Sequence, residues 1–349
     1  MMKIAHVVWG METGGVETML VNIINEQVRT EKVALFIIND FVEETIINKI
    51  SSKCLIKRIN RKPGTKEYLK IAKLNFQLFL FRPNIIHVHS YQVSTLLKGK
   101  WRIVRTIHST HNKTDEYSKM DALYAISKAV KDRTAEQGFT NVTVIDNGID
   151  AKSFEKKNKQ EQNNGVYQLV QVGRLTTRAK GQDILLNALG ILVNERKITN
   201  FMMHFIGTGG SEGELRKMTN ELCISNHVVF EGFKDQEYIK KNLYKYDTFI
   251  QPSRFEGFGL TVAEAIAAKV PVLVSDIEGP MEIIANGKYG MHFKKGDVVD
   301  LADKLETILK GGYDYSMIDS AYEYVKEHYD VSVTARKYIE EYKKVISKK

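Results

Sequence analysis

The chain has few cysteines and no long apolar run. Only two cysteines, Cys54 and Cys223, occur in 349 residues, which fits a reducing cytosol better than a disulfide-stabilised secreted protein. No run of about eighteen apolar residues is found, and residues 2–10 lack the long apolar region of a signal peptide. These absences predict a cytoplasmic protein without a transmembrane helix or a secretory signal.

Familiar metal and phosphate motifs are also missing. No Asp-x-Asp motif occurs, and the loop at residues 10–15 has neither the G-x-G-x-x-G spacing nor the lysine of a P-loop. Four histidines are candidate zinc ligands: His87, His89, His108 and His111. Because no cysteine or carboxylate at a suitable spacing completes that set, no metal and no cofactor are expected.

Positive charge is concentrated in one part of the chain. The net charge is +9, and residues 49–105 alone hold 14 basic residues and a single acid, Glu67. No recognition motif accompanies these charges, so nucleic acid is not expected as a partner. Two interpretations stay open: a solvated basic surface, or peripheral contact with an anionic membrane or lipid-linked molecule. Residues 66–81 set lysines beside an apolar stripe, and we expect any membrane contact to be driven by charge rather than by insertion.

Apolar runs of strand length alternate with segments of helical periodicity, which is typical of parallel sheets. The first half predicts strands at residues 3–9, 33–38, 84–89, 102–108, 122–126 and 142–145, and helices at 17–29 and 66–81. Residues 151–165 are polar and are interpreted as a linker. The second half predicts strands at 167–172, 201–206, 228–230, 246–252 and 270–274, and helices at 182–195 and 331–349.

One segment of the second half joins a strand, a glycine-rich turn and a helix start. It runs from Ser253 to Ala265, and two acids, Glu256 and Glu264, bracket seven residues. Ligands of open α/β sheets bind at the carboxyl ends of strands, where backbone N–H groups and a helix start attract anions. Amides for a diphosphate beside acids for hydroxyl groups suit a nucleotide sugar.

This segment resembles the E-x7-E motif of retaining glycosyltransferases of family 4, which have the GT-B fold. Four further matches precede this segment in the expected order along the chain: Gly14-Gly15-Val16-Glu17, Thr106-Ile107-His108, Asn147-Gly148-Ile149-Asp150, and Val172-Gly173-Arg174-Leu175 with Lys180-Gly181. The resemblance covers nearly the whole chain. It implies an α/β fold class with two Rossmann-like domains facing a central cleft.

The resemblance also implies how the domains divide. The expected parts are an acceptor-binding domain at residues 1–150, a linker at 151–165, a nucleotide-sugar-binding domain at 166–328, and a terminal helix at 329–349 that crosses back to the first domain.

For the donor, the resemblance implies that Glu264 accepts hydrogen bonds from the ribose hydroxyls and that Glu256 contacts the donor sugar. Phe233 would lie beside the base. Four consecutive residues would offer backbone N–H groups to sugar and phosphate: Gly257, Phe258, Gly259 and Leu260. Arg174 and Lys180 would neutralise the leaving diphosphate in place of a metal ion, although both could be solvated surface cations.

In the first half, glycine at Gly14 and Gly15 would let the backbone approach a donor phosphate or the acceptor across the cleft. The alternative is an ordinary strand-to-helix turn. His108 follows a strand, and the resemblance places the matching histidine beside the transferred sugar. Ser127 and Lys128 also follow a strand and are interpreted as contacts for an anionic acceptor.

The resulting hypothesis is a metal-independent, retaining hexosyltransferase with His108, Arg174, Lys180 and Glu256 as catalytic residues. Its donor would be a nucleotide sugar, expected to be a UDP-sugar. Its acceptor would be lipid-linked or a saccharide, in bacterial surface polysaccharide synthesis. Two alternatives stay open: a sugar-nucleotide epimerase of the same fold, and a homologue that binds sugar nucleotides without catalysis.

Overall fold

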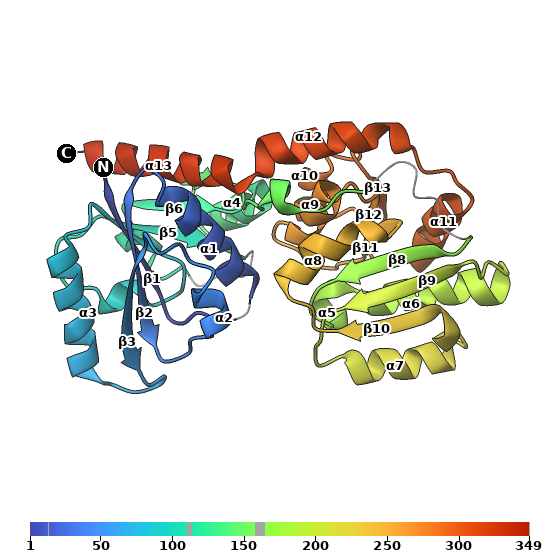
Figure 1. The fold of residues 1–349 in the computed structure, drawn as a ribbon, viewed down its shortest axis with the longest axis horizontal. Helices are drawn as coiled ribbons and strands as arrows, with labels where there is room; N and C mark the ends of the chain where they lie inside the picture. The colour runs from blue at the N-terminus through green and yellow to red at the C-terminus, as the bar shows by residue number, and fades with distance from the viewer. Residues whose placement is uncertain (13, 110–113, 158–164, 349) are drawn as a thin grey trace. The chain divides into compact units, whose positions relative to one another are not determined.

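The computed structural model describes residues 1–12, 14–109, 114–157 and 165–348 (Figure 1). Contacts divide the chain into two units, which are Met1–Ile149 with Asp330–Lys349, and Asp150–Tyr329. We call them unit 1 and unit 2. Each is built on one sheet in which every paired strand is parallel. The expectation of two parallel-sheet α/β domains is therefore confirmed.

The sheet of unit 1 has seven strands in the order β3-β2-β1-β4-β5-β6-β7. The strands are β1 (Lys3–Val8), β2 (Lys32–Asn39), β3 (Leu55–Arg61), β4 (Ile85–Val88), β5 (Ile103–Ile107), β6 (Ala122–Ala125) and β7 (Val142–Val144). The order reverses between β1 and β4, so the connections leave toward opposite edges there. That reversal point is where ligands of open α/β sheets bind.

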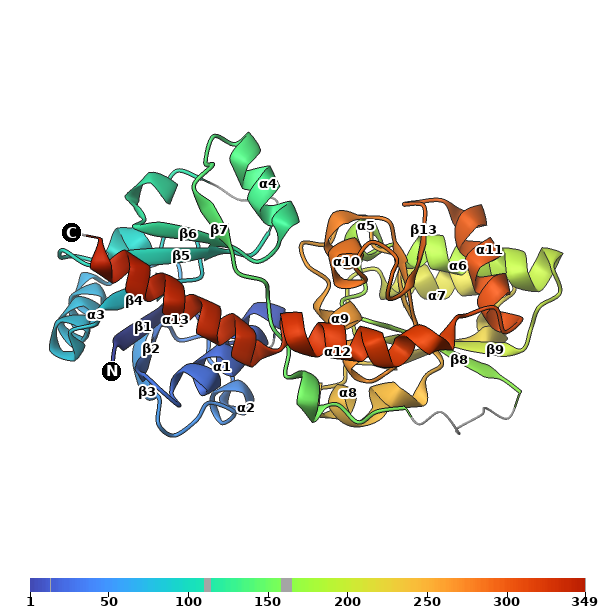
Figure 2. The same cartoon turned by 90° about the horizontal axis from the view of Figure 1, so that it is seen from above.

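The helices of unit 1 are α1 (Gly15–Gln27), α2 (Glu44–Ile47), α3 (Tyr68–Phe81), α4 (Lys128–Glu136) and α13 (Val331–Ser347), with short turns η1 (Ser94–Leu96) and η2 (Tyr117–Lys119). The last helix of the chain, α13, lies beside α1 in both views (Figures 1 and 2). Its Tyr338 and Tyr342 are fully buried in a core shared with Ile4 and Ile85. The last helix thus returns to the first unit, as the fold class predicts.

The sheet of unit 2 has six strands in the order β10-β9-β8-β11-β12-β13. The strands are β8 (Tyr167–Val172), β9 (Phe201–Ile206), β10 (Val228–Gly232), β11 (Thr248–Gln251), β12 (Val272–Ser275) and β13 (Met291–Phe293). The order reverses between β8 and β11. Because β8 and β11 are neighbours, the loops that follow their carboxyl ends meet at one edge of this sheet, which we call the switch edge of unit 2.

The helices of unit 2 are α5 (Thr177–Lys180), α6 (Gln182–Gly190), α7 (Glu212–Glu221), α8 (Gln236–Asn242), α9 (Leu260–Ala267), α10 (Glu278–Ile283), α11 (Val298–Leu309) and α12 (Ile318–Tyr329). Helix α6 continues into the π-helix η4 (Ile191–Glu195), and short 3-10 helices are η3 (Ala151–Ser153), η5 (Ser225–His227), η6 (Leu243–Lys245) and η7 (Tyr315–Met317). Helix α6 packs against α7 and α11, and α9 packs against α12. Apolar faces of the strands and these helices make up the core, with Leu169, Phe205 and Leu273 fully buried.

The beginning of the expected linker is packed rather than free. Ala151 and Phe154 are buried, and the ammonium of Lys157 lies 2.6 Å from a carboxylate oxygen of Asp247. The polar composition of residues 151–165 concealed these two apolar anchors, so residues 151–157 belong to unit 2. Residues 158–164 lie outside the described part of the chain. None of the helices described is both long enough and apolar enough to cross a bilayer.

Candidate active site

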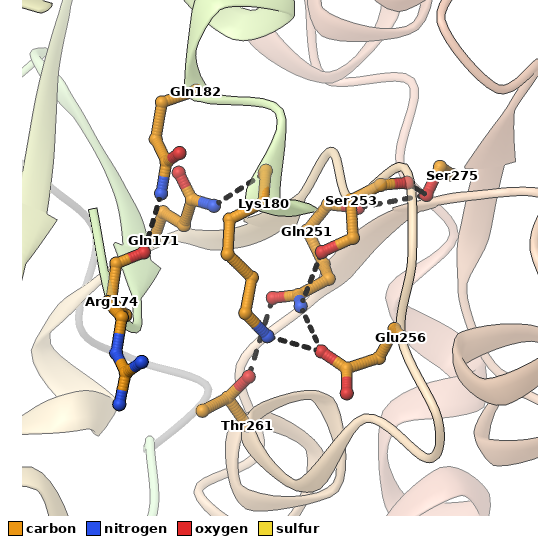
Figure 3. A network of polar contacts seen from close by, with 9 residues as sticks. All are labelled: Gln171, Arg174, Lys180, Gln182, Gln251, Ser253, Glu256, Thr261 and Ser275. Carbon is orange, nitrogen blue, oxygen red and sulfur yellow. Dashed lines mark hydrogen bonds and ion pairs between the residues drawn. The ribbon is translucent and has the colours of Figure 1, made fainter. Parts of the chain in front are cut away.

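The switch edge of unit 2 brings together two of the predicted site residues. Lys180 ends the loop and short helix that follow β8, and Glu256 lies in the turn after β11 (Figure 3). The Lys180 ammonium is 2.5 Å from Oε2 of Glu256. Both side chains are only partly exposed, so this ion pair is better protected from solvent than an ordinary surface pair.

A glutamine at the end of β11, the strand that leads into this turn, positions the carboxylate of Glu256. Gln251, the last residue of β11, donates from Nε2 to Oε2 of Glu256 at 3.1 Å and to the Ser253 hydroxyl at 2.9 Å. The Thr261 hydroxyl lies 3.4 Å from the amide oxygen, Oε1, of Gln251. The sequence interpretation missed Gln251, although a polar side chain ending an otherwise apolar strand was a usable signal.

Two more glutamines hold the backbone of the loop after β8. Gln171 donates to the carbonyl of Lys180 at 3.2 Å, and Gln182 donates to the carbonyl of Arg174 at 3.1 Å. Both are buried. These bonds fix the loop at its two ends, and so they set the points from which the two cations project.

Gly181 lets the two loops touch. Its φ is +66°, and a Cβ placed there would lie 1.9 Å from the carbonyl oxygen of Pro252. The backbone N–H of Arg254 donates to the carbonyl of Ala179 at 2.9 Å. Arg254, quoted within the motif, has a structural role, because its guanidinium makes two bonds of 2.6 Å to the carboxylate of Asp183 on α6.

The side chain of Arg174 differs from that of Lys180 in having no partner among the described residues. Its side chain is exposed, and in the described residues it makes no hydrogen bond or ion pair. In Figure 3 the side chains of Arg174 and Lys180 run in the same direction from their loop. A free arginine fork at this position can bind an anion with two parallel hydrogen bonds.

The glycine turn leads directly into α9. Gly259 has φ +104° and stands just before the helix, which begins at Leu260. The first N–H groups of a helix have no intrahelical acceptor and carry partial positive charge. The backbone of this turn also passes close to α10, since a Cβ on Gly279 would lie 2.8 Å from the carbonyl oxygens of Glu256 and Phe258.

The side chain of Phe258 is not part of this surface. It is 2% exposed and meets Tyr329 edge-on with ring centroids 5.4 Å apart. Any contact of Phe258 with a ligand would therefore come from its backbone, in keeping with the prediction for residues 257–260. Phe233, predicted to lie beside the base, follows β10 and is 57% exposed.

Glu264 lies within α9 and is buried. Gln236 on α8 donates to its Oε1 at 2.8 Å. Burial raises the pKa of Glu264 to about 7, and the hydrogen bond from Gln236 and the charge of Lys240 offset only part of that shift. A buried acid with one oxygen already bound can accept further hydrogen bonds through its remaining lone pairs.

In unit 1, a row of histidines lies at the strand-order reversal. Nδ1 of His6 is 3.0 Å from Nε2 of His89, and Nδ1 of His89 is 3.3 Å from Nε2 of His108. At the other end, Nε2 of His6 is 2.8 Å from Oε1 of Gln27. Burial lowers the pKa of His6 and of His108 to about 4, and it lowers the pKa of His89 well below its ordinary value. These imidazoles are therefore neutral near pH 7.

In a row of hydrogen-bonded neutral imidazoles, the tautomer of one ring fixes the tautomer of the next. Each ring donates from one nitrogen and accepts at the other. With the Gln27 carbonyl toward His6, the Nε2–H of His6 donates to Gln27. His89 and His108 must then donate from Nε2 in turn. The Nδ1 of His108 is left as an acceptor, and it has no hydrogen-bond partner among the residues that the structure describes. His108, just beyond β5, thus presents a lone pair.

Two histidines of this row and the neighbouring His87 form a group that resembles a metal site. His6, His87 and His89 each offer a ring nitrogen within 4.8 Å of the others. His87 is already bonded through both nitrogens, at 2.5 Å to the Tyr342 hydroxyl and at 2.7 Å to that of Thr106. A metal ion here would have to displace such bonds. His111 lies outside the described residues.

The remaining predicted residues of unit 1 stand at helix starts. Gly14 precedes α1, and Gly15 is its first residue. The φ of Gly14 is −162°, an extended conformation open to any residue. Ser127 is buried and caps α4, accepting from the N–H of Val130 at 3.1 Å. The Lys128 ammonium is 2.5 Å from Asp132. These contacts give Ser127 and Lys128 structural roles in α4, and their acceptor contact stays a prediction.

Comparison with known proteins places both units in glycosyltransferase families. Residues 152–327 match the family described as glycosyl transferases group 1, and residues 13–153 match glycosyltransferase family 4. The first match spans half of the chain, and the two together span most of it. The chain therefore belongs to the group 1, family 4 glycosyltransferases, as its motifs indicate.

Two relatives show the range of similarity. An uncharacterized glycosyltransferase of Methanocaldococcus jannaschii is 27% identical over 74% of this chain and 75% of its own length. The lipopolysaccharide 1,6-galactosyltransferase of Escherichia coli is 24% identical over 85% of this chain and 86% of its own length.

Solved structures agree in fold. A glycosyltransferase of Rickettsia africae superimposes with a TM-score of 0.83 at 20% identity, covering 100% of this chain and 99% of its own. Anabaena HepE, solved in complex with UDP and glucose, gives a TM-score of 0.80 at 19% identity, covering 98% of this chain and 99% of its own. The fold is therefore GT-B, and the protein is a glycosyltransferase.

Proposed function

We propose that the protein transfers a hexose from a UDP-sugar to a lipid-linked or saccharide acceptor, with retention of the anomeric configuration. The process it would serve is the synthesis of a bacterial surface polysaccharide. Support comes from the name of the E. coli relative, a lipopolysaccharide galactosyltransferase. It also comes from HepE, whose solved complexes contain UDP and UDP-glucose.

The observation that carries the proposal is the meeting of charges at the switch edge of unit 2. Lys180 and Glu256 are 2.5 Å apart. Arg174 lies on the same loop as Lys180, and its side chain has no partner in the described part of the chain. A nucleotide sugar combines a doubly charged diphosphate with several hydroxyl groups. The two cations and the start of α9 suit the former, and Glu256 suits the latter.

The proposed reaction breaks the bond between the anomeric carbon and the diphosphate oxygen. Arg174 and Lys180 stabilise the charge that grows on the departing diphosphate. The acceptor hydroxyl forms the new bond from the same face of the sugar. Its proton goes to a phosphate oxygen of the leaving group, so atoms and charge balance without a protein nucleophile.

Three further assignments belong to this proposal. Glu264 accepts hydrogen bonds from the ribose hydroxyls, and the Nδ1 lone pair of His108 accepts one from a hydroxyl of the sugar or the acceptor. The two cations make a divalent ion unnecessary. The basic residues of unit 1 bring the protein to an anionic membrane that carries the acceptor.

The experiment uses UDP-glucose and UDP-galactose labelled at the anomeric carbon, incubated with bacterial membranes and with soluble saccharides. NMR of the product would show an α-linked sugar if configuration is retained. Formation of an epimer from the nucleotide sugar alone would favour the epimerase. Donor binding without turnover on any acceptor would favour a non-catalytic homologue.

A further inference from the structure

Helix α3 exposes large apolar side chains on the side that is turned away from the core of unit 1. Leu74 and Leu78 are fully buried and hold the helix on the unit 1 core. Five large apolar side chains on the same helix are mostly exposed: Tyr68 (71%), Leu69 (87%), Phe76 (61%), Phe79 (58%) and Leu80 (61%). Such a concentration in 14 residues marks an interaction surface.

The exposed side chains form one continuous stripe. Leu69, Phe76 and Leu80 are seven and four residues apart, and so they lie on the same side of the helix. Phe79 and Tyr68 lie next to that line, and Leu74 and Leu78 point the opposite way. Both views show α3 at the margin of unit 1 (Figures 1 and 2). The helix is therefore apolar on its inner and its outer side.

The border of the stripe is positively charged. Lys66, Lys73 and Arg82 are exposed, and Lys70 is partly exposed. None of these four makes an ion pair with another described residue. The one acid nearby, Glu67, is occupied by the backbone N–H of Lys62 at 2.6 Å and by the Thr65 hydroxyl at 3.2 Å. The charge of Glu67 acts on Lys70 and Lys62, so the four cations beside the stripe are offset only in part.

We propose that α3 lies flat in the headgroup region of an anionic phospholipid bilayer, with Leu69, Phe76 and Leu80 inserted at the acyl boundary. Aromatic and leucine side chains bordered by lysines are typical of interfacial helices. A second copy of this chain would set the same cations against one another, which disfavours self-association through this face. A helix of 14 residues spans about 21 Å, too little to cross the hydrocarbon core.

This proposal differs from the sequence-based expectation of binding by charge without insertion. The helical period of residues 66–81 was readable in the sequence, but it did not reveal which stripe the sheet would cover. Leu74, Leu78 and Phe81 pack on the unit 1 core, and the five side chains of the stripe are turned outward. The inference does not rest on the proposed sugar transfer, and its test uses neither donor nor acceptor.

The first test is sedimentation of the full chain with vesicles of phosphatidylcholine alone, or of equal parts phosphatidylcholine and phosphatidylglycerol. The wild-type protein should bind the anionic vesicles and stay partly bound in high salt, where screening removes charge attraction. The triple variant Leu69→Ser, Phe76→Ser, Leu80→Ser should lose at least roughly tenfold in binding. The control Val166→Ser, Val299→Ser changes exposed apolar residues of unit 2 and should bind as wild type.

Equal binding by the triple variant, with an unchanged circular dichroism spectrum, would overturn the proposal. So would a triple variant that differs from wild type only by loss of a dimer in size-exclusion chromatography. Complete release of the wild-type protein from the vesicles by high salt would also overturn the proposal, because charge attraction alone would then explain the binding.

The second test measures depth. A tryptophan introduced by Phe76→Trp should be quenched by vesicles whose acyl chains carry bromine, and one introduced by Val299→Trp should not. The two native tryptophans, Trp9 and Trp101, give the background, which the wild-type protein measures. Equal quenching of the two reporters would show that α3 does not enter the bilayer and would overturn insertion.

Discussion

The ammonium nitrogen of Lys180 and the Oε2 oxygen of Glu256 lie 2.5 Å apart across the two loops of the switch edge. Lys180, which we assign to the diphosphate, is thus bound by Glu256, which we assign to the sugar, when no ligand is present. A donor entering this site competes with an internal ion pair for both groups.

Removing the negative charge of Glu256 should therefore separate binding from catalysis. In Glu256→Gln, Lys180 is released to the diphosphate, and affinity for UDP should rise by about 0.5–1 kcal/mol. Turnover should fall, because the acid no longer contacts the sugar. Calorimetry and a donor-consumption assay measure the two effects. Glu278→Gln, at an exposed acid of the same unit, is the control. A weaker UDP complex in Glu256→Gln would refute the competition.

The two cations should matter for turnover far more than for folding. Arg174→Ala and Lys180→Ala should each lower turnover by about a hundredfold or more, the usual effect of removing one preorganised transition-state donor. Arg178→Ala removes an exposed arginine of the intervening helix α5 and should leave turnover unchanged. Thermal unfolding monitors stability in all three. Turnover should survive EDTA. Loss of activity in EDTA with recovery in a divalent ion would contradict the metal-free account.

Glu264 should make nucleotide affinity depend on pH. Ribose hydroxyls donate to its ionised form, and burial raises its pKa to about 7. UDP affinity should therefore increase from about pH 6 to about pH 8, and binding near pH 7 should release protons, which is detectable in buffers of different ionisation enthalpy. Glu264→Gln should weaken binding by about 1–3 kcal/mol and remove the pH dependence. An unchanged pH profile in the variant would remove the ribose assignment.

The same acid should cost stability. Its folded-state pKa is raised from the model-peptide value of 4.5 to about 7, so the folded state binds the extra proton within that window. Stability is then lost as the pH rises through the window, at most about 1.4 kcal/mol per unit of pKa difference. Glu264→Gln should accordingly raise the unfolding temperature above pH 7.

The histidine row of unit 1 should have the opposite effect. Burial lowers the pKa of His6 and of His108 from 6.5 to about 4. The unfolded chain then binds more protons between these values, and unit 1 should lose stability as the pH falls through that window. Both tryptophans, Trp9 and Trp101, lie in unit 1, so their fluorescence follows this unit alone. An unfolding temperature that stays constant from about pH 7 to about pH 5 would contradict the burial of neutral imidazoles.

The sequence was most informative where function lies in short local patterns. The strand, glycine turn and helix around Glu256 could be predicted because their spacing is set within a dozen residues. So could the position of Lys180 and Gly181, whose close approach to Pro252 only a glycine permits. The alternation of strands and helices likewise predicted two parallel sheets.

Contacts that depend on sheet order could not be predicted. Lys180 reaches Glu256 only because β8 and β11 are neighbours, and no local pattern encodes that pairing. The link from Gln27 through His6 to His108 depends in the same way on β1 lying beside β4. The two strands β3 and β13 were also missed, since β3 carries three basic residues and β13 has only three residues.

The most direct measurement is a calorimetric titration of UDP into the wild-type protein, the double variant Arg174→Ala, Lys180→Ala, and the control Arg178→Ala. The account predicts one UDP bound per chain, with the same affinity in the control, and a loss of binding in the double variant while the fold is kept. Unchanged UDP affinity in the double variant would contradict the assignment of the switch edge of unit 2 as the donor site.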